Sequence, residues 1–126
     1  KLPTSVAPPG GPVRVPPVVR RLDYEGELAV VMGPDGSIAG EGDPGVQTRQ
    51  ALENIAAALE RAGATLADVV RTRIYVTDIG RWEDVARVHG EVFGAHPPVT
   101  SMVEVRRLID ARILVEIEAE AVVAPA

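Results

Sequence analysis

Apolar residues follow two different repeats along the chain, and each repeat predicts a different kind of element. Over residues 46–62 and 82–93 they recur every three or four positions, which predicts two amphipathic helices. Over residues 70–77, 100–105 and 113–123 they largely alternate with polar residues, which predicts strands. The order of strands, helix, strand, helix and strands predicts an α+β domain with both helices on one face of a mixed sheet.

Local signals fix the ends of both helices. Asp43 and Pro44 open the first, because aspartate is a good N-cap and proline suits the first helical position, and Gly63 ends it. Its expected inner face is Val46, Leu52, Ile55, Leu59 and Ala62. The second helix follows Gly80 and closes at Gly94, with an expected inner face of Trp82, Val85, His89 and Val92, and Phe93 alongside. Between the helices, the spacing of Thr65 and Asp68 predicts a short capped turn.

The first third of the chain leaves alternatives open. Residues 1–17 are rich in proline and glycine, which predicts an extended arm or a partly disordered tail. Residues 18–32 fit two strands around a turn at 23–26, or one long strand interrupted at Gly26. Residues 33–36, Gly-Pro-Asp-Gly, predict a tight turn, and residues 37–39 a short strand after it.

Composition narrows the function classes. The chain has 126 residues, 46% of them apolar and 25% charged, which is the balance of one soluble globular domain. A net charge of −5 and 3% aromatics argue against a nucleic-acid partner. No apolar run is long enough to span a membrane, and we expect a cytoplasmic location. The absence of cysteine excludes disulfides, thiolate metal sites and a cysteine nucleophile.

Four stretches after Pro34 resemble the RidA/YjgF family of reactive-intermediate deaminases: QTRQALENIAAALERAGATLADVVRTRIYVTDI, VHGEVFG, PPVTSMVEV and LVEIEAEAVV. The resemblance implies a chorismate-mutase-like α+β fold. It also implies a homotrimer whose sheets line a central barrel, with small-molecule clefts between subunits. Family members with the full site hydrolyse enamines and imines derived from amino acids.

A second resemblance concerns residues 1–33. The stretch KLPTSVAPPGGPVRVPPVVRRLDYEGELAVVMG is similar to an internal piece of the fumarylacetoacetate hydrolase family. We therefore interpret the chain as one domain, 1–126, in which a foreign arm and hairpin (1–33) join a RidA-like portion (34–126). Such a chimera, engineered or recombined, is expected to have little or no native catalysis. The alternative origin is a natural, divergent RidA member.

The RidA resemblance implies a substrate-binding arginine at the position of Thr100 and a glutamate that positions water at Glu116. Threonine cannot supply the charge that pairs with a substrate carboxylate. Thr100 and Ser101 are therefore predicted only to bind substrate, and Glu116 to be catalytic. Together they define a second hypothesis, a divergent deaminase or hydrolase of small imines or carbonyl compounds acting in the cleft between subunits.

Glu25 and Glu27 are candidate metal ligands, because residues two apart on a strand share a face and paired carboxylates bind hard cations. The hydrolase resemblance implies the same role and gives a third hypothesis, a Mg²⁺- or Mn²⁺-dependent dicarbonyl hydrolase. Two carboxylates alone would hold such a metal weakly, so no cofactor is the primary expectation. A wet or subunit-facing strand is the structural alternative.

The stripe of Glu116, Glu118 and Glu120 also has a structural reading. Three close carboxylates repel one another unless cations lie among them. Arg71 and Arg73 of the neighbouring strand are predicted to supply that charge if a trimer forms. His89 is predicted to be a packed residue of the second helix rather than a base.

Overall fold

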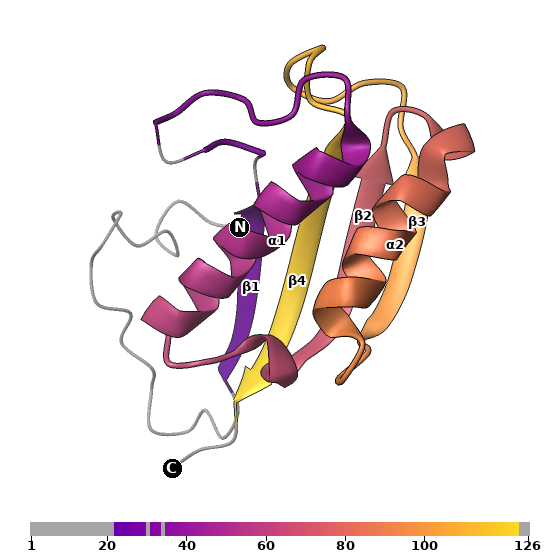
Figure 1. Cartoon of the computed structure of the whole chain (residues 1–126). Helices are drawn as coiled ribbons and strands as arrows, with labels where there is room; N and C mark the ends of the chain where they lie inside the picture. Colours follow the sequence, from indigo (N-terminus) through magenta and orange to yellow (C-terminus); the bar gives the residue numbers. More distant parts are fainter. Residues whose placement is uncertain (1–21, 30, 34, 124–126) are drawn as a thin grey trace.

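The computed structural model of the chain describes residues 22–29, 31–33 and 35–123, with side chains described from residue 31 onward. Its elements are β1 (Leu22–Ala29), α1 (Pro44–Arg61), η2 (Leu66–Asp68), β2 (Val69–Val76), η3 (Ile79–Arg81), α2 (Trp82–Phe93), β3 (Val99–Glu104) and β4 (Val115–Val123). Figure 1 shows α1 and α2 lying side by side in front of the strands. The predicted α+β class, with two helices over a mixed sheet, is confirmed.

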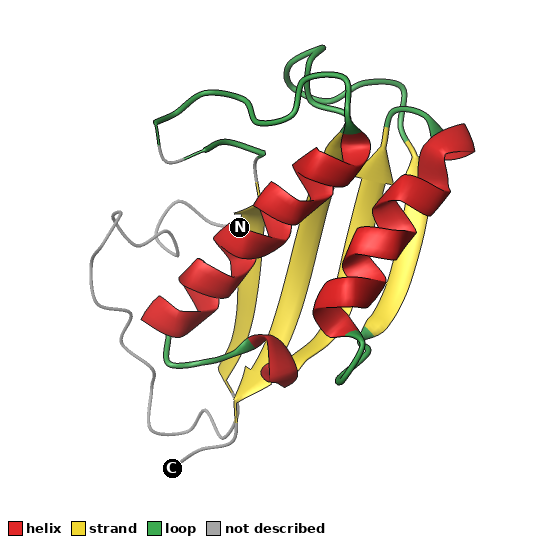
Figure 2. Ribbon diagram, viewed as in Figure 1, coloured by secondary structure: helices red, strands yellow, loops and turns green. Residues whose placement is uncertain are grey.

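The described strands form one sheet in the order β1-β4-β2-β3. β4 runs antiparallel to both β1 and β2, whereas β2 and β3 are parallel. Both helices cover the same face of this sheet, as Figure 2 shows, and no described element covers the other face. The sheet therefore has a helix-covered face and an open face, with β3 as an edge strand.

The core lies between the helices and the sheet. Leu52, Ile55 and Leu59 of α1 pack against the buried, alternate residues of the two central strands. These strand residues are Thr72, Ile74, Val76, Val115, Ile117, Ala119 and Ala121. The predicted alternation of β4 is confirmed, because its glutamates are only half-buried between the buried positions.

The ends of α1 are formed as predicted, but its inner face differs. The Asp43 carboxylate accepts hydrogen bonds from the backbone N–H groups of residues 45 and 46, and Gly63 adopts a positive φ of 78° after the helix. Val46 is nevertheless 48% exposed, whereas Gln47 and Thr48 are fully buried. Gln47 is buried because its side-chain amide pairs with the backbone of the segment before β4.

A β-bulge explains the difference at the start of β2. Val69 pairs with Ala121 and Arg71 with Glu120, so Val70 is an extra residue on this strand. Val70 consequently lies 47% exposed, and Val69 takes its place in the core. The strict alternation predicted from Val70 therefore begins only at Thr72.

Residues 22–29 form one strand, not a hairpin. β1 pairs continuously with β4 from Leu22 to Gly26, and a register shift lies between Gly26 and Ala29. Of the two alternatives for this region, the interrupted single strand is correct, although residues 18–21 lie outside the described part. The tight turn at residues 33–36 is confirmed by a 3.0 Å hydrogen bond from Gly36 N–H to the Gly33 carbonyl and by the positive φ of Gly36.

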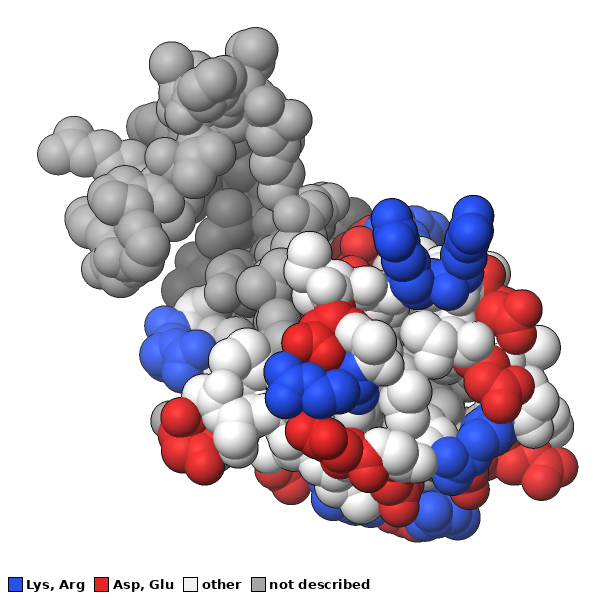
Figure 3. Space-filling model, turned by 90° about the horizontal axis from the view of Figure 1, so that it is seen from above, with Lys and Arg blue, Asp and Glu red and all other residues white. Residues whose placement is uncertain are grey.

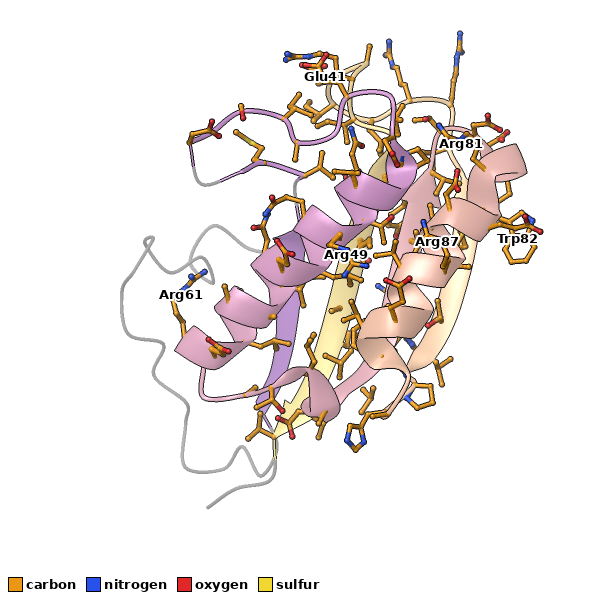
Figure 4. The ribbon with its side chains drawn as sticks, in the orientation of Figure 1. Glu41, Arg49, Arg61, Arg81, Trp82 and Arg87 are labelled. Atoms are coloured by element: carbon orange, nitrogen blue, oxygen red, sulfur yellow. The ribbon has the colours of Figure 1, made fainter. Side chains whose placement is uncertain are left out.

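The second helix has its predicted bounds but exposes its first residue. Val85, Val88 and Phe93 are buried, whereas Trp82 is 51% exposed. Figure 4 shows Trp82 projecting from the outer side of α2, away from α1. The assignment of the indole to the inner face, made from its spacing to Val85, is therefore wrong, although Val85 itself is buried in the same turn.

Candidate functional site

An ordered cluster of charges lies on the open face of the sheet. The Arg73 guanidinium donates to Glu118 Oε2 at 2.9 Å and to Glu120 Oε1 at 2.7 Å. Arg71 adds a weaker ion pair with Glu120 at 3.7 Å. The predicted arginine–glutamate pairing therefore exists, and it forms within one chain. Two of the three carboxylates of the β4 stripe are neutralised in this way.

Glu116 is different from its two neighbours on β4. It pairs across the ladder with Tyr75, and within the described part of the chain its carboxylate forms no hydrogen bond or ion pair. The Tyr75 hydroxyl donates instead to Glu118 Oε2 at 3.3 Å. Burial, followed by the negative charge of Glu118, raises the pKa of the Tyr75 phenol, so it stays protonated. Glu116 is thus a half-buried, available carboxylate beside a neutral phenol.

Thr100 lies on the other face of the sheet, where it joins a chain of polar groups. Its Oγ1 is 2.9 Å from Thr72 Oγ1 and 3.2 Å from the Pro98 carbonyl oxygen. Thr72 Oγ1 is in turn 3.0 Å from His89 Nε2 on α2. Thr72 is fully buried, whereas Thr100 is exposed at the sheet edge. The cross-strand register of β2 and β3 brings these groups together, which the sequence pattern could not reveal.

His89 occupies a mostly apolar site. Its ring lies 4.7 Å, centroid to centroid, from the ring of Phe93, and its one side-chain hydrogen bond among the described residues is to Thr72. Burial lowers the pKa of His89 and favours the neutral imidazole. His89 is partly buried, as predicted for a packed residue. Its Nε2 is also connected, through the Thr72 hydroxyl, to the exposed hydroxyl of Thr100.

The three predicted RidA-type site residues are not assembled within one chain. Ser101 pairs with Arg73 and is exposed on the open face, opposite to its neighbour Thr100. Glu116 shares the open face with Ser101, but β2 lies between their strands, so two strand spacings of roughly 4.8 Å each separate them. A site that uses both Glu116 and Thr100 therefore requires a second subunit.

Two hollows lie away from these residues. One, of about 260 Å³, lies between the amino-terminal half of α1 and α2 and is lined by residues that include Arg49 and Arg87. Figure 4 shows these two arginines side by side between the helices, and both bind the Glu91 carboxylate. The other hollow, of about 240 Å³, is mainly apolar and includes Val76, Val85 and Leu114. Glu116, Thr100 and Ser101 line neither of them.

Glu25 and Glu27 lie in β1, where the backbone is described but the side chains are not. The register shift between Gly26 and Ala29 interrupts the two-residue repeat on which their pairing was predicted. Among the residues with described side chains, no group of three or more His, Cys, Asp or Glu residues is placed to hold a metal ion. Metal binding at Glu25 and Glu27 thus stays a prediction.

Viewed from above in Figure 3, acidic and basic side chains are interspersed on the described surface. Over the described residues, neither helix combines the length and apolar character needed to cross a bilayer.

Comparison with known proteins agrees with the fold. The endoribonuclease L-PSP family matches residues 20–123. The 2-iminobutanoate/2-iminopropanoate deaminase of Escherichia coli K12 is 33% identical over 125 residues, which cover 94% of this chain and 96% of the deaminase. RutC family protein PH0854 of Pyrococcus horikoshii is 44% identical over 79 residues, which cover 63% of this chain and 62% of that relative's length.

Solved structures of proteins from this family are also similar to the chain. The crystal structure of Rv2704, a YjgF/YER057c/UK114 family member from Mycobacterium tuberculosis, shares 63% identity over 68% of this chain and 73% of its own, with a TM-score of 0.64. The YjgF gene product of E. coli shares 32% identity over 90% and 88% of the two chains, with a TM-score of 0.69.

These matches bear directly on the predicted chimera. The family match begins at residue 20 and runs through residues 32–35, where a junction was expected. The E. coli deaminase likewise aligns with 94% of the chain. A foreign hairpin from the fumarylacetoacetate hydrolase family, and an engineered origin, are therefore not supported. The chain belongs to the RidA/YjgF family, the family described as endoribonuclease L-PSP.

Proposed function

We propose that this protein is a hydrolytic deaminase of small 2-imino acids, acting in a cleft between subunits with Glu116 as the group that orients and deprotonates water. The observation that carries the proposal is the 33% identity, over almost the full length of both chains, with the 2-iminobutanoate/2-iminopropanoate deaminase of E. coli. The availability of Glu116 supports the same role, since Arg73 engages the other two glutamates of its strand.

The required chemistry is modest. An iminium carbon is already electrophilic, so the site has to hold the substrate, position one water molecule and accept its proton. The Glu116 carboxylate, which has no partner among the described residues, can accept a hydrogen bond from that water, whereas Glu118 and Glu120 are bound to Arg73. The Tyr75 phenol, which burial keeps protonated, can donate a hydrogen bond on the same face.

The absence of arginine at position 100 affects binding rather than the water step. The family resemblance implies a bidentate arginine–carboxylate contact at this position, and a threonine hydroxyl supplies a single neutral hydrogen bond. We therefore expect a high KM for 2-imino acids and weak discrimination between acids and uncharged imines. Little or no native catalysis, the expectation from the missing arginine, is the competing outcome.

The proposed assembly is a homotrimer. The open face of the sheet carries exposed apolar side chains beside the charge cluster, with Val99 72% and Val103 48% exposed. Glu116 and Thr100 lie on opposite faces of one chain, so only a neighbouring subunit can complete a cleft that contains both. A small-molecule ligand in that cleft is the expected partner. An RNA partner is not expected, since acidic residues outnumber basic ones by 18 to 13.

The test is the hydrolysis of 2-iminopropanoate generated in the assay by an amino-acid oxidase acting on alanine. Semicarbazide competes for the imine, so an active protein lowers the amount of semicarbazone and raises the rate of ammonia release. The Glu116→Gln variant should lose this effect, and Glu60→Gln, an exposed carboxylate of α1, should keep it. Equal semicarbazone yields with and without the wild-type protein would contradict the proposal.

A further inference from the structure

A continuous line of polar groups connects the interior of the helix-covered face to the exposed edge of β3. It consists of His89 Nε2, Thr72 Oγ1 and Thr100 Oγ1, with successive distances of 3.0 and 2.9 Å. The three residues come from α2, β2 and β3. The middle hydroxyl is fully buried, so a proton can enter or leave this line only through the imidazole or the exposed Thr100 hydroxyl.

In one of two possible arrangements of its hydrogen atoms, this line of three groups can accept a proton at Thr100 and pass it to His89. With the proton of neutral His89 on Nδ1, Thr72 donates its hydroxyl hydrogen to Nε2, and Thr100 donates to Thr72 Oγ1. The lone pairs of Thr100 are then free to accept a hydrogen bond at the edge of the sheet. In the opposite direction, Nε2–H donates to Thr72, Thr72 to Thr100, and Thr100 to the Pro98 carbonyl.

We propose that His89, acting through Thr72 and the exposed Thr100 hydroxyl, is a proton relay that serves a substrate bound at the β3 edge. The proposal rests on the proposed imine hydrolysis and adds a second proton-transfer group to Glu116. Thr100 is the member that touches the substrate or its water. Thr72 and His89 act through it and are positioning residues.

The relay balances the two steps of hydrolysis. In the first, the oxygen of water bonds to the iminium carbon and the C=N π pair moves to nitrogen. One water proton passes to Glu116. In the second, Glu116 returns this proton to the amine nitrogen, the C–N bond breaks, and ammonia leaves with the electron pair. The remaining hydroxyl becomes the carbonyl as its proton passes to Thr100, Thr100 passes its own to Thr72, and Thr72 passes its own to His89 Nε2, which afterwards releases it to solvent.

The surroundings of His89 suit a base that is neutral at rest. Phe93 contacts it from α2, Thr72 faces it from β2, and Thr100 follows from β3. Arg87 and Glu91, two residues to either side of His89 on α2, form an ion pair, and Arg49 of α1 also pairs with Glu91. Burial alone lowers the pKa of His89. Because the relay requires neutral His89, kcat/KM should fall as pH drops through that lowered pKa.

One experiment does not depend on activity. The imidazole ¹⁵N chemical shifts report which nitrogen carries the proton, and a His96→Gln variant removes the other histidine of the chain. We expect neutral His89 to carry its proton on Nδ1 in the otherwise unaltered protein, and to shift toward the Nε2–H form in Thr72→Val. An Nε2–H imidazole with Thr72 intact would overturn the relay, whatever the outcome of the imine assay.

The second experiment is the pH profile of kcat/KM for the imine. In Thr72→Val and His89→Gln, kcat/KM should no longer fall as pH drops through the pKa of His89. Its value at neutral pH should be lower by roughly 10²-fold, since general base catalysis contributes about 10²–10⁴-fold. Thr72→Ser keeps the hydroxyl and should restore both the pH dependence and the rate, and His96→Gln should change neither. An unchanged profile in Thr72→Val would contradict the relay. A wild-type protein without imine hydrolysis would instead contradict the proposed function.

Discussion

Gln47 of α1 holds the backbone around Leu114, which leads into β4. The Leu114 N–H donates to Gln47 Oε1 at 2.7 Å, and Gln47 Nε2 donates to the Arg112 carbonyl at 2.8 Å. The Gln47 side chain is fully buried. A polar residue on the inner face of a helix therefore serves as the link between α1 and the strand that carries Glu116.

Replacing this amide should be costly. Gln47→Leu keeps the volume but leaves the Leu114 N–H and the Arg112 carbonyl without their partner at a partly buried site, and each such loss costs about 1–3 kcal/mol. We expect the free energy of unfolding to fall by about 2–4 kcal/mol, measured by urea denaturation at a fixed protein concentration. Gln50→Leu, one turn further along α1, is the matched control and should change it much less. Equal effects of the two substitutions would refute this role of Gln47.

The inner faces of the helices show what the sequence could and could not predict. Capping residues act locally, so Asp43, Pro44 and Gly63 correctly located the ends of α1. Burial of Gln47 depends on a partner 67 residues away in the chain, which no local pattern contains. The exposure of Val70 depends on a bulge against β4, which also requires knowledge of the strand register.

In the site, too, local sequence patterns predicted some features, whereas contacts between distant parts of the chain were missed. Alternation along β2 and β4 placed the arginines and the glutamates each on one strand face, and their pairing, predicted if a trimer forms, is found within one chain. The line from Thr100 through Thr72 to His89 was missed because it depends on the parallel register of β2 and β3 and on the packing of α2 against β2. The chimera predicted from residues 1–33 is not supported, because the family match already begins at residue 20 and continues to residue 123.

Tyr75 should titrate above the usual tyrosine range. Burial and the negative charge of Glu118 raise its pKa, and the positive charge of Arg73 lowers it. We expect Arg73→Met to move the pKa of Tyr75 further up and Glu118→Gln to move it down, as followed by ultraviolet absorbance. A Tyr24→Phe background removes the other tyrosine of the chain. Shifts in the reverse directions would show that the charge cluster is not formed in solution.

Asp110 and Arg112 give a local test of the segment that leads into β4. Hydrogen bonds from the Arg112 side chain and backbone lower the pKa of Asp110 to about 2. A depressed carboxyl pKa stabilises the fold above the unfolded value and ceases to do so as pH falls through the folded value. In Arg112→Gln the pKa should rise toward the ordinary value of about 3.9. Carboxyl ¹³C titration measures it, with Asp35 as a distant reference; an unchanged Asp110 would refute the contact.

The proposed homotrimer predicts the molecular mass of the protein in solution. Light scattering coupled to size exclusion should give about three times the 13.3 kDa of one chain. Val103→Lys places a charge on the open face beside Tyr75 and should lower the trimer fraction, whereas Val46→Lys, equally exposed on the opposite, helical side, should not. A monomer at all concentrations would leave Glu116 and Thr100 on separate surfaces and exclude a shared cleft.

The most direct test compares ammonia release from freshly generated 2-iminopropanoate for the wild-type protein and Glu116→Gln under matched conditions. If Glu116 activates water, the wild type accelerates release above the spontaneous rate, and the variant, which keeps the shape of the side chain but cannot accept the proton, falls by about 10²-fold or more toward that spontaneous rate. A variant as fast as the wild type would contradict the assignment of Glu116.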